Sequence, residues 1–163
     1  MKVSINPLDP DSMIEAAKQI REYAESLEWK NASIVAALAE KGETLARAHL
    51  ATVSGDAVEG NSVTFSHSDS SSGMKASGVV EAGGQAAYIE FGTGTLGEGT
   101  YPKGNPWEYN VPSSFKRKDV NGVTYWVYNG TKMYGWASYP FMYDTGADLH
   151  KLVEPIAKEV FKS

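Results

Sequence analysis

Hydrophobic residues recur at intervals of three and four through the first part of the chain, which is the spacing of an amphipathic helix. The first stripe consists of Met13, Ala17, Ile20, Ala24 and Leu27. Ser12 precedes Glu15 by three residues, a capping-box pattern in which each side chain bonds to an unpaired amide. The pattern predicts a helix that begins near Ser12.

A second apolar stripe follows, and it predicts a second helix. Its members are Ile34, Val35, Leu38, Leu45 and His49. Asn31 is a suitable N-cap for this helix, and Gly42 predicts a bend or break within it. We interpret His49 as a packing residue on the stripe.

The pattern changes to short β-favouring runs after residue 56. These runs cover residues 57–59, 62–65, 79–81 and 87–91, with glycine-containing turns between them. Residues 66–73 are rich in serine and predict a flexible loop. A sheet is therefore expected within residues 57–91.

Two Asn-Gly pairs, at residues 121–122 and 129–130, predict type I′ turns between antiparallel strands. The corresponding strands of this meander are residues 115–120, 123–128 and 131–136. In the central strand Val123, Tyr125 and Val127 face one side, and Thr124, Trp126 and Tyr128 face the other. Such a strand is either covered on both sides or presents one face to a partner.

A last apolar stripe predicts a C-terminal helix. It consists of Leu149, Leu152, Val153, Ile156 and Val160. Pro140 suits the first turn of this helix, and Thr145 with Asp148 offers a second possible start. Pro155 lies inside the stripe and predicts either a kink or a later start.

Together these elements predict a single α+β domain over residues 1–163. Residues 10–53 form its helical N-terminal part and residues 57–91 a mostly antiparallel β-sheet. Residues 92–138 form an inserted loop and β-hairpin arm, and residues 139–163 a C-terminal helix that packs on the sheet. We find no internal repeat and no linker that divides the chain.

Composition excludes several classes of protein. The 163 residues carry a net charge of −5, which argues against a nucleic-acid-binding surface, and the basic run at residues 116–118 is best explained as a solvated segment. The chain has no cysteine, so disulfides and thiolate chemistry are excluded. No apolar run approaches the ~20 residues of a membrane span. The first residues lack the hydrophobic stretch of a signal peptide, so we expect folding in a cytoplasm.

Gly92, Gly94 and Gly97 reproduce the spacing of a dinucleotide-binding turn, but their surroundings do not fit one. Such a turn leads directly into a helix whose N-terminal amides hold the pyrophosphate. The glycine- and proline-rich residues 98–106 cannot form that helix, and Glu90 and Glu98 would repel phosphate. The three histidines are scattered and support neither a catalytic triad nor a metal site. We expect no catalytic residues, no cofactor, no metal and no enzymatic activity.

Two short segments, Tyr88-Ile89-Glu90-Phe91-Gly92-Thr93-Gly94 and Pro140-Phe141-Met142 at the start of the last helix, occur in this order. By having these two segments in this order, the chain resembles the small neck proteins of long-tailed bacteriophages, which join head to tail or complete the tail. The order of helices, strands, first segment, second segment and helix covers nearly the whole chain.

The resemblance implies a structural virion protein that forms a ring of about six copies between the head connector and the tail. Its partners would be further copies of itself and neighbouring neck, connector, tail-tube or tail-terminator proteins. DNA would pass through the ring without specific binding, and no membrane would be involved. The protein would reside in the virion neck, and in the host cytoplasm during assembly. The role of tail terminator remains an alternative within the same neck region.

The expected contacts with other subunits involve the first segment and the aromatic arm. These residues are Tyr88, Glu90, Phe91, Thr93, Tyr125, Trp126, Tyr128, Tyr134 and Trp136. On the predicted strand, Tyr88 and Glu90 share one side, and Phe91 faces the other. Gly92 and Gly94 would end the strand sharply, and Phe141 and Met142 would anchor the last helix that Pro140 opens. Another function remains open, a carbohydrate- or cell-surface-binding module that uses Trp107, Trp126 and Trp136.

Overall fold

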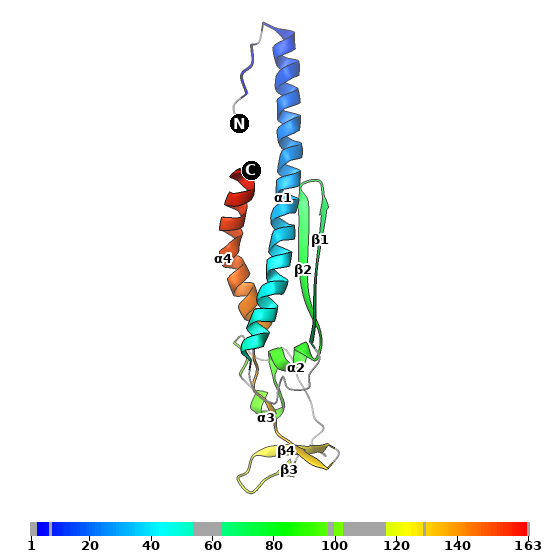
Figure 1. Cartoon of the computed structure of the whole chain (residues 1–163), viewed down its shortest axis with the longest axis vertical. Coiled ribbons are helices and arrows are strands. Elements are labelled where there is room, and N and C mark those ends of the chain that lie inside the picture. The colour runs from blue at the N-terminus through cyan, green and yellow to red at the C-terminus, as the bar shows by residue number, and fades with distance from the viewer. Residues whose placement is uncertain are drawn as a thin grey trace. The chain divides into compact units, whose positions relative to one another are not determined.

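The computed structural model describes residues 3–6, 8–53, 63–97, 100–102, 117–128 and 130–162, and it has the α+β fold expected from the sequence. The expected strand at 57–59 and the first two residues of the expected strand at 115–120 lie outside this part. The helices are α1 (Pro10–Thr52), α2 (Ala86–Phe91), α3 (Gly94–Gly97) and α4 (Phe141–Lys162) (Figure 1). The strands are β1 (Val63–Ser72), β2 (Lys75–Gly84), β3 (Arg117–Lys118), β4 (Thr124–Tyr128), β5 (Thr131–Met133) and β6 (Gly135–Trp136).

The chain divides into two compact units. The first contains Met1–Lys41, His67–Val79 and Lys151–Ser163. The second contains Gly42–Ser66 and Val80–His150. The elements α1, β1, β2 and α4 each contribute residues to both units.

In the first unit, α1 is a single helix where the sequence pattern predicted two. It begins at Pro10, and the Asp9 carboxylate accepts a hydrogen bond of 3.1 Å from the Asp11 amide, as an N-cap does. The prediction that Asn31 caps a second helix is wrong. Its side-chain amide instead donates to the carbonyl oxygen of Met74 at 2.9 Å, so this polar residue within α1 holds the β1–β2 turn.

The serine-rich residues 66–73 do not form the predicted loop, because most of them belong to strand β1. β1 and β2 form a two-stranded sheet joined by a turn that contains Gly73, whose φ of 57° favours glycine. The hydroxyl oxygens of Ser70 and Ser77 lie 2.9 Å apart on the two strands. At Gly78 a Cβ atom would lie 3.0 Å from a methyl group of Val35 on α1. Pairing and close packing on α1 therefore outweigh the weak strand propensity of serine.

The core of the second unit is formed by Ala86, Ile89 and Phe141, which are at most 4% exposed. The ring of Phe65 on β1 meets the Phe141 ring edge-on, with centroids 6.0 Å apart. Above Phe65 lies the guanidinium group of Arg47 on α1, 5.0 Å from the ring centroid. The sequence prediction that Phe141 anchors the last helix in the core is confirmed.

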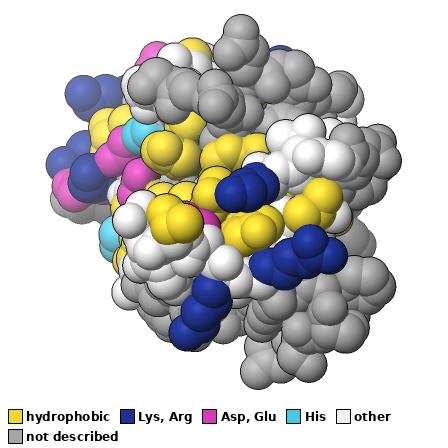
Figure 2. Space-filling model, turned by 90° about the horizontal axis from the view of Figure 1, so that it is seen from below, with side chains coloured by type: hydrophobic (Ala, Val, Ile, Leu, Met, Phe, Trp, Pro, Cys, Tyr) yellow, Lys and Arg dark blue, Asp and Glu magenta, His cyan; other side chains and the backbone are white. Residues whose placement is uncertain are grey.

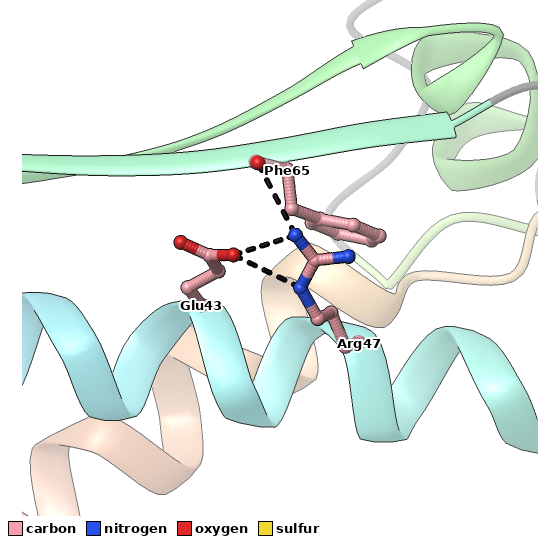
Figure 3. Close-up of polar contacts among 3 residues, drawn as sticks. All are labelled: Glu43, Arg47 and Phe65. Carbon is pink, nitrogen blue, oxygen red and sulfur yellow. Dashed lines mark hydrogen bonds and ion pairs between the residues drawn. The ribbon is translucent and has the colours of Figure 1, made fainter.

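Arg47 also fastens strand β1 to helix α1 through polar contacts (Figure 3). Its Nε and one terminal nitrogen bind the Glu43 carboxylate at 2.9 and 2.6 Å, and that nitrogen donates to the Phe65 carbonyl oxygen at 3.3 Å. One side chain thus joins a helical ion pair to the backbone of the neighbouring strand.

Gly42 neither bends nor breaks α1, contrary to the prediction from the sequence. The helix continues through it. A Cβ atom at this position would lie 2.6 Å from a methyl group of Val80 and 3.0 Å from one of Leu149. The absence of a side chain at Gly42 therefore leaves room for Val80 on β2 and Leu149 on α4.

Strands β3, β4 and β5 form a three-stranded antiparallel meander, as predicted, in the order β3-β4-β5. The predicted extent of its third strand, residues 131–136, is wrong, because β5 ends at Met133 and the residues of β6 pair with Thr93 and Gly94. The turn at Asn121-Gly122 is longer than the predicted two residues. Asp119 and Val123 close a three-residue loop, and the Gly122 amide donates to the Asp119 carbonyl oxygen at 3.0 Å. The Asp119 carboxylate accepts from the amides of Asn121 and Val123. This side chain favours the longer loop, in which Gly122 adopts a φ of 78°.

Helix α4 starts at Phe141, directly after Pro140, whose carbonyl oxygen accepts the first helical bond from Asp144. The alternative start at Thr145 is wrong, because its hydroxyl donates to the Phe141 carbonyl oxygen within the helix at 2.7 Å. Pro155 does not move the start of the helix, which continues past it to Lys162.

Two helical glycines provide a matched test of this packing. Apart from its own turns of the helix, Gly146 has no described heavy atom within 4 Å of a Cβ position, so Gly146→Ala should raise the free energy of unfolding by roughly 0.5–1 kcal/mol. Gly42→Val should lower it by about 1–3 kcal/mol, because its side chain overlaps Val80 and Leu149. Urea unfolding followed by circular dichroism measures both changes. Equal effects of the two substitutions would contradict the close approach at Gly42.

Candidate functional site

The two segments that carry the family resemblance meet in the second unit, where they form what we call the motif junction. It consists of residues 89–94, Tyr101 and residues 135–143. The prediction that residues 87–91 form a strand is wrong, because these residues belong to the helix α2. Tyr88 and Phe91 therefore lie one turn apart on the same side of a helix, and not on opposite faces of a strand.

Glu90 is the centre of the motif junction. It is 5% exposed, and its carboxylate accepts hydrogen bonds from two backbone amides at the start of α4. Oε2 accepts from the Met142 amide at 2.8 Å, and Oε1 accepts from the Tyr143 amide at 3.0 Å. The first amides of a helix have no partner within it. Glu90 thus caps α4 from a position 52 residues earlier in the chain.

Tyr101 completes the surroundings of this carboxylate. Its hydroxyl donates to Oε1 of Glu90 at 3.3 Å, and its ring meets those of Phe91 and Tyr143 edge-on, with centroids 4.9 and 6.1 Å away. Burial raises the pKa of Glu90 above its ordinary value, although the hydrogen bonds from Met142, Tyr143 and Tyr101 act in the opposite direction. Burial and the neighbouring Glu90 charge also raise the pKa of Tyr101. No spacing in the sequence indicates that Tyr101 contacts Glu90.

The backbone also joins the two segments. The Tyr139 amide donates to the Ile89 carbonyl oxygen at 2.8 Å. Thr93 and Gly94 then pair with Trp136 and Gly135 in antiparallel bridges, and the Thr93 hydroxyl accepts from the Trp136 amide at 3.3 Å. The residues just before the inserted arm therefore pair antiparallel with the residues just after it.

Three glycines make this pairing possible. A Cβ atom at Gly92 would lie 2.7 Å from backbone atoms of Trp136 and Ser138, and one at Gly135 would lie 2.0 Å from the Thr93 carbonyl oxygen. At Gly94 a Cβ atom would lie 2.6 Å from the ring of Trp126. All three glycines have φ between 61° and 89°. Gly92 and Gly94, the first two glycines of the G-x-G-x-x-G spacing, thus serve close packing, and the helix α3 that begins at Gly94 has four residues.

The expected interface residues differ in their surroundings. Glu90 and Thr93 are buried, at 5% and 6% exposure, and bond within the chain. Phe91, Trp126 and Trp136 contact other parts of the motif junction or pack against it. Tyr88 is 43% exposed. In the meander, the rings of Tyr125 and Tyr134 lie 5.7 Å apart, and Tyr128 pairs with Thr131 through the backbone.

The histidines and acids of the described residues form no group of three that could hold a metal ion. His49 bonds to the Asp148 carboxylate at 3.1 Å, which links α1 to α4 in the second unit. Within the described residues, no helix has the length and apolar character that crossing a membrane requires. In comparisons with known proteins, no family model, no curated protein and no solved structure matches this chain.

Replacement of Glu90 tests whether the cap holds α4 in place. Glu90→Ala should lower the free energy of unfolding by roughly 1–3 kcal/mol, because it removes the acceptor of two partly buried amides. Glu81→Ala, which removes an exposed carboxylate from β2, is the matched control and should change the stability by less than about 0.5 kcal/mol. Chemical unfolding measures both, and similar effects of the two variants would refute the capping role.

The raised pKa of Glu90 predicts a specific pH dependence. Between pH 4.5 and its pKa in the folded protein, Glu90 is protonated when folded and ionised when unfolded. The folded state binds more protons there, so the contribution of Glu90 to stability falls as the pH rises. The difference in unfolding free energy between the wild type and Glu90→Gln should therefore decrease across this window. A difference that increases with pH would show that the hydrogen bonds outweigh burial.

Proposed function

We propose that this protein is a structural component of the neck of a long-tailed bacteriophage, where about six copies form a ring. The ring joins the tail to the head connector and leaves a passage for DNA. The role is assembly, and the polar groups of the motif junction hold the fold together. Tail completion and tail termination are both compatible with this proposal.

The observation that carries the proposal is the bond between Glu90 and the first amides of α4. The resemblance to neck proteins rests on two short segments, each of which could occur by chance. In this chain the acidic residue of the first segment caps the helix that the second segment opens. Their joint presence therefore has a physical basis, which supports reading the pair as one signature.

Gly92 and Phe141 also make the positions of the two segments depend on each other. Gly92 allows the backbone of residues 136–138 to approach, and Phe141 enters the core as the first residue of α4. A substitution in either segment would disturb the position of the other. Such coupling supports a shared structural role for the two segments better than two independent binding sites.

The net charge of −5 is also compatible with the proposed passage of DNA, because an acidic wall repels phosphate. The carbohydrate-binding alternative receives no comparable support. Trp136 pairs with Thr93, and the Trp126 ring lies against Gly94. These two tryptophans therefore contribute to the packing around the motif junction.

The direct test is the removal of the gene from the phage or prophage that encodes it. After induction, electron microscopy should show DNA-filled heads and separate tails in place of joined particles. Wild-type protein supplied from a plasmid should restore joined particles, whereas the Glu90→Ala protein should restore few of them because its fold is weakened. Normal yields of infectious particles without the gene would overturn the proposal.

A further inference from the structure

The loop between β3 and β4 brings a reactive pair of residues to the surface. The pair is Asn121-Gly122, and both residues are exposed. Glycine has no side chain to shield its backbone nitrogen, so in an Asn-Gly pair this nitrogen can reach the side-chain amide of the asparagine. Apart from its chain neighbours, no described heavy atom lies within 4 Å of a Cβ position at Gly122. Crowding by the rest of the described chain therefore does not hinder a reaction between the two residues.

The reaction open to this pair is deamidation. The Gly122 backbone nitrogen attacks Cγ of Asn121, and the new N–C bond closes a five-membered imide ring. The Cγ–Nδ2 bond breaks, and Nδ2 leaves as ammonia together with the proton of the Gly122 amide. Water then opens the ring at one of its two carbonyl carbons, which gives either aspartate or isoaspartate. In isoaspartate the main chain runs through the former side chain, and water is the only reagent that either product needs.

The hydrogen bonds of the loop oppose this reaction. The Gly122 amide donates to the Asp119 carbonyl oxygen at 3.0 Å, and this bond must break before the amide can lose its proton. The bond and the φ of 78° at Gly122 match a three-residue hairpin loop built on a type I turn. In that turn the residue in the place of Asn121 has a ψ of about 0°. Ring closure requires Cβ of Asn121 and the Gly122 nitrogen to be eclipsed about the Cα–C bond, which needs a ψ far from that value.

Asp119 holds the loop in this closed form. Its Oδ1 atom accepts hydrogen bonds from the amides of Asn121 and Val123 at 2.8 and 2.9 Å. The Asp119 amide donates to the Val123 carbonyl oxygen at 3.0 Å, which closes the base of the loop. Strand β3, which leads into the loop, consists only of Arg117–Lys118. Opening this end of the arm therefore breaks few bonds and leaves the core of the second unit intact.

We propose that Asn121 is a deamidation site that reacts when the β3–β4 loop opens. In the closed loop the attacking nitrogen is hydrogen-bonded and wrongly placed, whereas in the open loop the pair behaves as in an unfolded chain. The observed rate is then the rate of the unfolded chain multiplied by the fraction of time for which the loop is open. A loop that is closed about ten times as often as it is open slows the reaction about tenfold. This proposal does not depend on the neck role.

The reaction also disfavours renewed closure of the loop. Isoaspartate adds a methylene group to the main chain between residues 121 and 122, and the bonds that close the loop do not fit the longer path. Either product places a second carboxylate near that of Asp119, and like charges repel. The new charge alters a surface on which Lys and Arg side chains lie next to hydrophobic ones, as Figure 2 shows for one face. Deamidation is therefore a one-way mark of loop opening.

Deamidation rates in the full chain test whether the loop controls the reaction. The folded protein and the protein in guanidinium chloride are incubated at mildly alkaline pH. Chymotrypsin, which cleaves after aromatic residues, then separates the two Asn-Gly pairs for mass spectrometry. In the folded protein Asn121 should react about tenfold or more slowly than in the denaturant, where Asn129 serves as a second unprotected reference. Equal rates at Asn121 in the two conditions would overturn the proposal.

Variants of Asp119 separate the effect of the loop from that of the Asn-Gly pair itself. Asp119→Ala removes the acceptor of two loop amides and should raise the rate at Asn121 in the folded protein about fivefold. Asp119→Asn keeps an oxygen acceptor and should stay within about twofold of the wild-type rate. Glu81→Ala, which removes an exposed carboxylate from β2, is the matched control and should not change the rate. Circular dichroism verifies that each variant is folded, and a wild-type rate in folded Asp119→Ala would refute the control by the loop.

Two further measurements distinguish loop opening from slow chemistry. Exchange of the Gly122 amide with deuterium should be slowed by a factor similar to that of the reaction at Asn121, and an unprotected Gly122 amide would contradict the proposal. In NMR spectra of the purified isoaspartate form, the contact between Lys118 and Thr124 should be lost, while that between Phe65 and Phe141 persists. An isoaspartate form that keeps its β3–β4 contacts would show that the loop still closes, against the proposed one-way mark.

Discussion

The carboxylate of Glu90 is the constraint on which the second unit depends. The first amides of a helix have no acceptor within the helix, and those at the start of α4 are partly shielded from water, so an acceptor from elsewhere in the chain stabilises them. Glu90 supplies both oxygens to Met142 and Tyr143. That bond fixes where α4 begins, and the start of α4 in turn places Phe141 in the core beside Ile89. The cap therefore also determines the residue at which the last helix begins.

The hydrogen bonds to Glu90 have good geometry, but burial of its carboxylate is unfavourable for the charged form. An ionised carboxylate at a helix N-terminus benefits from the amides and from the helix dipole. Burial opposes the charge, and it dominates the pKa of Glu90. The Tyr101 hydroxyl offsets part of the cost by donating a further hydrogen bond. Compensated burial of this kind favours a single defined geometry at the start of α4.

The sequence predicted the elements better than their contacts. Hydrophobic spacing placed the two long helical regions, although it divided α1 into two helices, and the Asn-Gly pairs indicated the meander. The spacing could not show that Asn31 binds the Met74 carbonyl oxygen or that Gly42 receives Val80, because both partners lie far away in the chain. Residues 87–91 favour strands by propensity, yet they form a short helix whose Ala86 and Ile89 enter the core. Tertiary packing overrides local preference in each case, and the role of Glu90 follows only from the folded chain.

The two ends of the arm pair with each other, and this pairing affects how the sequence of the arm can change in evolution. Gly94 and Gly135 face each other in an antiparallel bridge, so the chain leaves the fold and returns to it at the same point. Lengthening a closed loop costs only ~0.6 kcal/mol for each doubling of its length. Within the segment between these glycines, the part that follows Tyr101 can therefore be extended or shortened while Tyr101 stays beside Glu90 and the capped helix stays intact. The rest of the fold is then unchanged, and a different arm would give the protein a different binding surface.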